Sequence, residues 1–158
     1  MKDRPSWHEY FMNMALLVAK RSTCLRRYVG AALIKNNQII ATGYNGTPKG
    51  LPHCSTTGCM RQILNVPSGE KHELCRGVHA EQNTIIQAAL NGTSIENTVL
   101  YSTHFPCVIC TKMILNAEIR TVYVLEDYND KLSKEILSES GTEVILINMK
   151  DKSLKKIV

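Results

Sequence analysis

The feature that most constrains the fold is the alternation of strand-like and helix-like segments along the chain. Short apolar runs rich in β-branched residues predict five strands, over residues 29–34, 38–44, 97–103, 121–125 and 143–148. Helical spacing of apolar side chains predicts helices over residues 79–90, 107–116 and 130–139, and a first helix that begins after Ser6. This order predicts an α/β fold, a three-layer α/β/α sandwich with a five-stranded mixed sheet.

Length and composition narrow the class of protein. A chain of 158 residues is expected to form a single domain over residues 1–158. Its apolar runs are far shorter than the roughly 20 residues that span a bilayer, and residues 1–6 lack an apolar signal core. We therefore expect a cytoplasmic protein without a membrane partner. The net charge of +5 is too modest to indicate a nucleic-acid partner, and the basic tail, residues 150–158, is expected to be frayed.

Residues 45–77 contain most of the glycine and proline, half of the cysteine and no long periodic run. A loop of about 30 residues is too long to be passive in a compact domain, so we expect it to be functional or tied down. The chain has six cysteines, at positions 24, 54, 59, 75, 107 and 110. In a reducing compartment these thiols indicate metal binding or catalysis rather than disulfides.

Two short motifs carry the chemistry. His79-Ala80-Glu81 stands where a helix is expected to begin, and Pro106-Cys107-x-x-Cys110 follows a strand and begins another helix. Cys-x-x-Cys in a first helical turn directs both sulfurs to one point, where the helix N-terminus favours thiolates. With His79 as third ligand, a tetrahedral Zn²⁺ keeps one position open for water, as in catalytic sites. Alone, the cysteine motif would also fit a redox pair or a structural zinc ribbon, and the histidine motif is a common helix start.

Glu81 lies two residues from the predicted histidine ligand, where it can take a proton from that water and pass it to a substrate nitrogen. His-x-Glu combined with Pro-Cys-x-x-Cys resembles the signature of the zinc-dependent nucleobase deaminases.

A narrower resemblance runs in order from about residue 4 to residue 148. Arg21-Ser22-Thr23-Cys24, Gly43-Tyr44-Asn45-Gly46 and the segment from His79 to Asn83 are similar to the deoxycytidylate (dCMP) deaminases of the cytidine/deoxycytidylate deaminase superfamily. The resemblance implies a cytidine deaminase-like fold. It also implies hydrolysis of dCMP to dUMP with release of ammonia, feeding dTMP synthesis. In such enzymes water activated by zinc attacks C4 of cytosine, while the carboxylate matching Glu81 protonates N3 and later the departing amine.

The resemblance also suggests residues that bind substrate. Asn45 matches an asparagine beside the sugar, although it would equally suit a strand-ending turn. Tyr128 follows a strand where an aromatic ring can close over the base, or it is simply exposed. His104 receives no catalytic role. Hydroxyl and guanidinium donors for the phosphate are offered after the first helix by Ser22, Thr23, Arg26 and Arg27, unless the two arginines face solvent.

Four cysteines remain, and the resemblance to microbial and phage members implies that they hold a second, structural zinc. The expected ligands are Cys24, Cys54, Cys59 and Cys75, with His72 as an alternative to Cys54 or Cys59. Free, partly buried thiols are the other interpretation. The resemblance further implies a homohexamer, activation by dCTP and inhibition by dTTP with Mg²⁺. The regulatory nucleotide would lie near Gly43, Tyr44, Asn45 and Gly46.

Two other functions remain open at this point. Within the deaminases, the substrate could be another cytosine or adenine compound, such as a tRNA adenosine or a riboflavin precursor. In a different class, the chain could be a zinc-stabilised binding module that has lost catalysis. The presence of Glu81 and the open metal position argue against that second reading.

Overall fold

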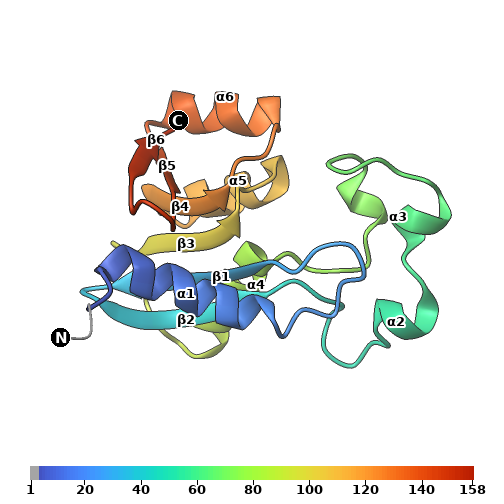
Figure 1. Ribbon diagram of the computed structural model, residues 1–158. Coiled ribbons are helices and arrows are strands. Elements are labelled where there is room, and N and C mark those ends of the chain that lie inside the picture. Colours follow the sequence, from blue (N-terminus) through green and yellow to red (C-terminus); the bar gives the residue numbers. More distant parts are fainter. Residues whose placement is uncertain (1–3) are drawn as a thin grey trace.

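The computed structural model describes residues 4–158 and is built around one six-stranded sheet in the order β2-β1-β3-β4-β5-β6 (Figure 1). β1 is antiparallel to both β2 and β3, whereas β3, β4 and β5 run parallel and β6 returns antiparallel to β5. The strands are β1 (Gly30–Lys35), β2 (Gln38–Tyr44), β3 (Val99–His104), β4 (Thr121–Glu126), β5 (Glu143–Ile147) and β6 (Leu154–Lys156).

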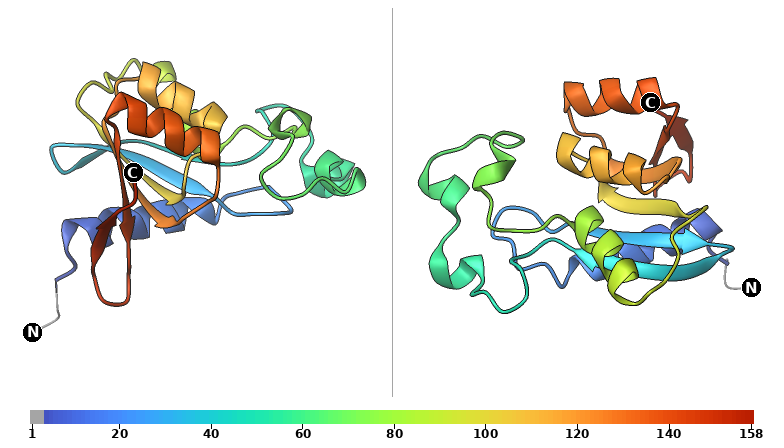
Figure 2. Two further views of the ribbon diagram at one scale, coloured as in Figure 1. Left: turned by 90° about the horizontal axis from the view of Figure 1, so that it is seen from above. Right: turned by 180° about the vertical axis from the view of Figure 1, so that it is seen from behind.

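Helices cover both faces of this sheet (Figure 2). α1 (Trp7–Ala19) lies on one face, and α4 (Ala80–Leu90), α5 (Val108–Asn116) and α6 (Lys131–Ser140) lie on the other. Two apolar clusters fill the spaces between the layers, one around Phe11 and Tyr101 under α1, and one around Leu100 and Ile114 under the other helices. The predicted three-layer α/β/α sandwich with a mixed sheet is confirmed.

Local sequence signals explain where the first elements begin and turn. The Ser6 hydroxyl accepts the Glu9 amide at 3.2 Å, and the Glu9 carboxylate accepts the Ser6 amide at 2.8 Å, which is the predicted capping box. Between β1 and β2 the chain turns through Asn36 and Asn37, with φ angles of 50° and 59°. Asparagine tolerates this left-handed conformation better than most residues, so the turn fits a tight hairpin.

The predicted count of five strands and the predicted frayed tail are wrong. Residues 154–156 form β6 and pair with β5, and the Lys156 ammonium lies 2.9 Å from the Glu143 carboxylate. Ile157 and Val158 then pack against the main apolar cluster. The strand was hidden because its three side chains are exposed and two are lysines, a composition that suits a sheet edge.

Residues 45–77 extend beyond one end of the sheet (Figure 1). They contain the short helices α2 (Cys54–Thr57) and α3 (Met60–Ile63) and the 3₁₀ turn η1 (His72–Leu74). The two ends of the segment are joined by paired hydrogen bonds between the backbones of Gly46 and Val78, at 3.1 and 2.8 Å. No helix in residues 4–158 is long and apolar enough to cross a membrane.

Candidate active site

Two helix N-termini bring the predicted zinc ligands together. His79 immediately precedes α4, and its amide is held by the Gln82 side chain at 2.8 Å. Cys107 immediately precedes α5, directly after the end of β3, and Cys110 lies in the first turn of that helix. The His79 Nδ1 atom lies 3.3 Å from the sulfur of Cys107 and 3.3 Å from that of Cys110.

This donor set fits a zinc ion. Zn–S and Zn–N bonds of ordinary length meeting at a tetrahedral angle place nitrogen and sulfur about 3.5 Å apart, close to the separations observed here. Imidazole and thiolate are also the ligands that zinc prefers. Both cysteines are buried, so bulk water does not compete for the sulfurs. Three protein ligands would leave one coordination position open.

The two cysteines differ in proton affinity. The pKa of Cys107 is lowered to about 4, chiefly because its sulfur accepts a hydrogen bond from the Cys110 thiol, and also because His79 lies beside it. The same hydrogen bond, together with burial, raises the pKa of Cys110. Hydrogen bonding with Cys107 also raises the pKa of His79. The cluster therefore holds one thiolate readily, and a metal would take the place of the remaining thiol proton.

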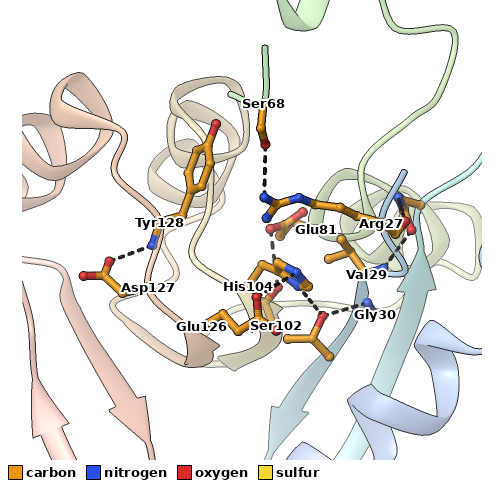
Figure 3. A network of polar contacts seen from close by, with 12 residues as sticks. Arg27, Val29, Gly30, Ser68, Glu81, Ser102, His104, Glu126, Asp127 and Tyr128 are labelled. Atoms are coloured by element: carbon orange, nitrogen blue, oxygen red, sulfur yellow. Dashed lines mark hydrogen bonds and ion pairs between the residues drawn. The ribbon is translucent and has the colours of Figure 1, made fainter. Parts of the chain in front are cut away.

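Glu81 stands on the buried side of this cluster, where only 4% of the residue is exposed. One carboxylate oxygen lies 3.5 Å from the Cys110 sulfur, and the other accepts the Ser102 hydroxyl at 3.3 Å (Figure 3). Burial raises the pKa of Glu81. A buried carboxyl group with a raised pKa, next to the predicted metal position, is suited to accept and return a proton.

A cavity of about 140 Å³ opens onto the cluster, and its polar lining is incompletely satisfied. In the described part of the chain, six buried side-chain nitrogen or oxygen atoms have no hydrogen-bond partner, and all but Thr142 Oγ1 belong to residues that line this cavity. They are Thr23 Oγ1, Arg26 Nη1, Arg61 Nε and both ring nitrogens of His72. Unpaired buried polar atoms are rare in folded proteins, so their convergence marks a ligand-binding pocket.

Comparison with known proteins agrees with this geometry. Residues 5–126 match the family described as the cytidine and deoxycytidylate deaminase zinc-binding region. The chain belongs to this family. Deoxycytidylate deaminase of Schizosaccharomyces pombe is 39% identical over 142 residues, which are 89% of this chain and 44% of that protein. ComE operon protein 2 of Bacillus subtilis is 38% identical over 143 residues, 90% of this chain and 71% of that protein.

Among solved structures, the dCMP deaminase of cyanophage S-TIM5 in complex with dCMP and dUMP has a TM-score of 0.71 and 33% sequence identity. The match covers 90% of this chain and 97% of the phage chain. The predicted membership of the deoxycytidylate deaminase family and the predicted cytidine deaminase-like fold are thereby confirmed. The chain spans less than half the length of the S. pombe relative.

Of the residues that we predicted to bind substrate, Asn45 is held most tightly by the protein itself. Its side-chain oxygen accepts the Ser22 hydroxyl at 2.6 Å and the Val29 amide at 2.9 Å, and its side-chain nitrogen donates to the Arg27 carbonyl at 2.9 Å. Asn45 therefore shapes the 22–29 loop. It also lines the cavity, as do Thr23, Arg26, Arg27 and Tyr128, whereas Ser22 does not.

Two contacts between the protein's own side chains cross the mouth of the cavity (Figure 3). The Arg27 guanidinium donates to the Ser68 hydroxyl at 3.0 Å and lies 5.8 Å from the centre of the Tyr128 ring. The Tyr128 hydroxyl packs so closely on Gly69 that it leaves no room for a Cβ atom there. Segment 45–77 and the loop after β4 thus meet over the pocket.

The predicted structural zinc ligands line the same cavity. The pKa of Cys54 is raised by burial and by the proximity of Cys59, Cys75 and Cys24. The sulfurs of Cys24 and Cys75 each accept a backbone amide two residues further on, at 3.4 Å in both cases. His72, the alternative ligand, lies beside the predicted ligands of the first zinc, with its ring centre 5.3 Å from that of His79.

Sequence reasoning missed Ser102 and Arg61, and it gave His104 no catalytic role. Ser102 is fully buried behind Glu81, and Arg61 reaches the cavity from α3. His104 also lines the cavity; its Nε2 atom lies 3.3 Å from the Glu126 carboxylate and its Nδ1 atom 3.0 Å from the Thr103 hydroxyl. The available signal was position: Ser102 and His104 stand on the strand that leads into the cysteine motif. Arg61 carried no signal, because segment 45–77 has no periodicity.

Proposed function

We propose that this protein is a dCMP deaminase, which hydrolyses dCMP to dUMP and releases ammonia. The observation that carries the proposal is the meeting of His79, Cys107 and Cys110 with the buried carboxyl group of Glu81, at the end of one cavity with unpaired donors. Curated relatives named deoxycytidylate deaminase, and a solved relative described as a complex with dCMP and dUMP, support the choice of substrate.

In the proposed reaction, a zinc ion held by His79, Cys107 and Cys110 would lower the pKa of a water molecule and so supply the nucleophile. Glu81 accepts the proton of that water and delivers it to N3 as the new C–O bond forms at C4. It then takes the proton of the new C4 hydroxyl and passes it to the exocyclic amine, which leaves as ammonia when the C–N bond breaks and C4=O forms. Ser102 keeps the carboxylate pointed at the base through its hydroxyl.

We further propose that Asn45 supports the sugar and that Tyr128 closes over the base. The phosphate is assigned to the donors after α1. Support comes from the unpaired Thr23 hydroxyl and Arg26 guanidinium in the cavity. Arg27 is the donor at the mouth, where its bond to Ser68 can be exchanged for a phosphate oxygen. Ser22 acts through Asn45.

A second, structural zinc is proposed for Cys24, Cys54, Cys59 and Cys75. The placement of all four cysteines along one cavity supports it, as do the amide-to-sulfur hydrogen bonds at Cys24 and Cys75, which would stabilise thiolates. Such a metal would hold segment 45–77 in place. Metal analysis of the purified protein is expected to find two zinc ions per chain, and a value of one would remove this proposal.

The remaining family properties are proposals that rest on relatedness. They are a cytoplasmic homohexamer feeding dTMP synthesis, activated by dCTP and inhibited by dTTP with Mg²⁺, with effectors near Gly43, Tyr44, Asn45 and Gly46. Gly43 has a packing role in addition: a Cβ atom there would lie 2.5 Å from the Thr84 nitrogen and 2.6 Å from the Ala80 oxygen.

The substitution Glu81→Gln tests the proposed chemistry. It keeps the size of the side chain and removes proton transfer, so we expect dCMP turnover to fall by about 10²–10⁴-fold while the zinc content stays unchanged. The matched control is Glu96→Gln, which makes the same change at an exposed position outside both motifs. Full activity in Glu81→Gln, measured by the loss of cytosine absorbance, would refute the assigned role.

A further inference from the structure

Arg61 is a buried cation without a counter-charge. Only 8% of the residue is exposed. One terminal nitrogen donates to the Pro67 carbonyl at 3.1 Å, while Nε is buried with no partner. None of the ion pairs found among residues 4–158 includes this guanidinium. Burying a charge that is neither paired nor fully hydrogen-bonded is costly, so an isolated guanidinium here requires an anionic ligand.

The position of Arg61 indicates which ligand that is. Its side chain lines the same cavity as His79, Glu81 and Tyr128. The only carboxylate in the lining is Glu81, which is already engaged by Ser102 and Cys110. The other charged side chains of the lining are three arginines: Arg26, Arg27 and Arg61.

We propose that Arg61 binds the 5′-phosphate of the substrate, so that segment 45–77 itself selects a nucleotide over a nucleoside. This inference rests on the proposed function. The cytosine base and the sugar are neutral, and the phosphate is the one group of dCMP that matches a buried cation. A planar guanidinium presents its N–H groups in the geometry that phosphate oxygens accept. The unpaired Thr23 hydroxyl and Arg26 nitrogen in the same cavity supply donors for the other oxygens.

Two other roles predict different behaviour. If Arg61 only supports the Pro67 carbonyl, its removal loosens segment 45–77 and weakens every ligand alike. If it only balances the thiolates of the four-cysteine cluster, its removal lowers the zinc content. A phosphate-binding role predicts a loss that is confined to phosphorylated ligands.

Calorimetric titration with the product dUMP and with deoxyuridine separates these cases without turnover. The zinc-loaded full chain is compared with Arg61→Gln, with Arg61→Lys, and with Arg76→Gln as a control that removes a charge from an exposed site in the same segment. We expect Arg61→Gln to weaken dUMP binding by about 10- to 100-fold and deoxyuridine binding by less than about 3-fold. Arg61→Lys should fall between the wild type and Arg61→Gln, and Arg76→Gln should match the wild type.

Equal losses for the two ligands, a fall in zinc content, or unchanged dUMP binding in Arg61→Gln would each overturn the inference. If Arg61→Gln does not fold, Arg61→Lys still tests the inference, because it keeps the charge but loses the planar guanidinium. dUMP binding as tight in Arg61→Lys as in the wild type would then overturn the role of the planar donor. Failure of the proposed function is seen separately, since the wild type would then neither bind dUMP nor deaminate dCMP.

Discussion

Replacing Gly43 with alanine should displace the helix that carries the catalytic residues. Gly43 lies in β2, directly under the first turn of α4, and its backbone has no left-handed φ that would itself require glycine. An added Cβ would lie 2.5 Å from the Thr84 nitrogen and 2.6 Å from the Ala80 oxygen. Both are backbone atoms of α4, so no side-chain rotation can relieve the contact.

The size of the effect follows from those distances. Restoring an ordinary contact of about 3.5 Å requires α4 to move by about 1 Å. Overpacking of this kind costs about 1–3 kcal/mol, and a backbone clash places Gly43→Ala near the upper end, about 3 kcal/mol. For a domain of this size the melting temperature should fall by roughly 6–12 °C. Because His79 and Glu81 begin α4, turnover should also fall.

Urea and thermal unfolding measure this effect in the absence of any nucleotide. Gly92→Ala is the control, because Gly92 has a φ of +62° and no atom within 4 Å of the added Cβ. Its cost is limited to backbone strain, about 1 kcal/mol. If Gly43→Ala proves as stable as the wild type, the packing argument is wrong, and Gly43 matters only for effector binding.

Two further predictions concern Ser102 and His8. Ser102→Ala should lower kcat by about 10-fold with little change in KM, because the Glu81 carboxylate loses the hydroxyl that orients it; an unchanged kcat would show that Ser102 has no positioning role. Burial lowers the pKa of His8 below the ordinary value of 6.5 that it has in the unfolded chain. Around that pH the unfolded state therefore binds more protons than the folded state. The free energy of unfolding should therefore fall between pH 7.5 and pH 5.5, and less steeply in His8→Gln; identical slopes in urea titrations would contradict this.

The meeting of the His79 motif with the Cys107 motif could be predicted because each motif is fixed by local structure. His79 and Glu81 are fixed relative to each other by one helix start, and Cys107 and Cys110 by another. Each motif constrains its own geometry, and the alternation of strands and helices places the two helix starts on one side of a sheet. The cap at Ser6 and the hairpin through Asn36 and Asn37 follow from equally local preferences.

Arg61 and β6 could not be predicted because their places depend on tertiary contacts. Segment 45–77 has no apolar periodicity that would say which side chains turn inward, so nothing distinguished the buried Arg61 from the exposed Arg76. β6 is a three-residue strand whose exposed lysines resemble a solvated tail.

Asn45 shows a different limit. The sequence marks it as a polar residue in a turn, and only the structure shows that both ends of its amide are already engaged within the protein. A single sequence does not distinguish a residue that binds substrate from a residue that shapes the neighbouring loop. The sugar-binding role of Asn45 therefore stays a prediction.

The central claim is that this site deaminates a nucleotide, and an ultraviolet assay of the zinc-loaded protein tests it most directly. dCMP and deoxycytidine are compared at matched concentrations, each with and without dCTP. We expect conversion of dCMP to dUMP with little conversion of deoxycytidine, and a higher rate if dCTP is an activator. No turnover of dCMP with dCTP present, from protein that retains its zinc, would contradict it.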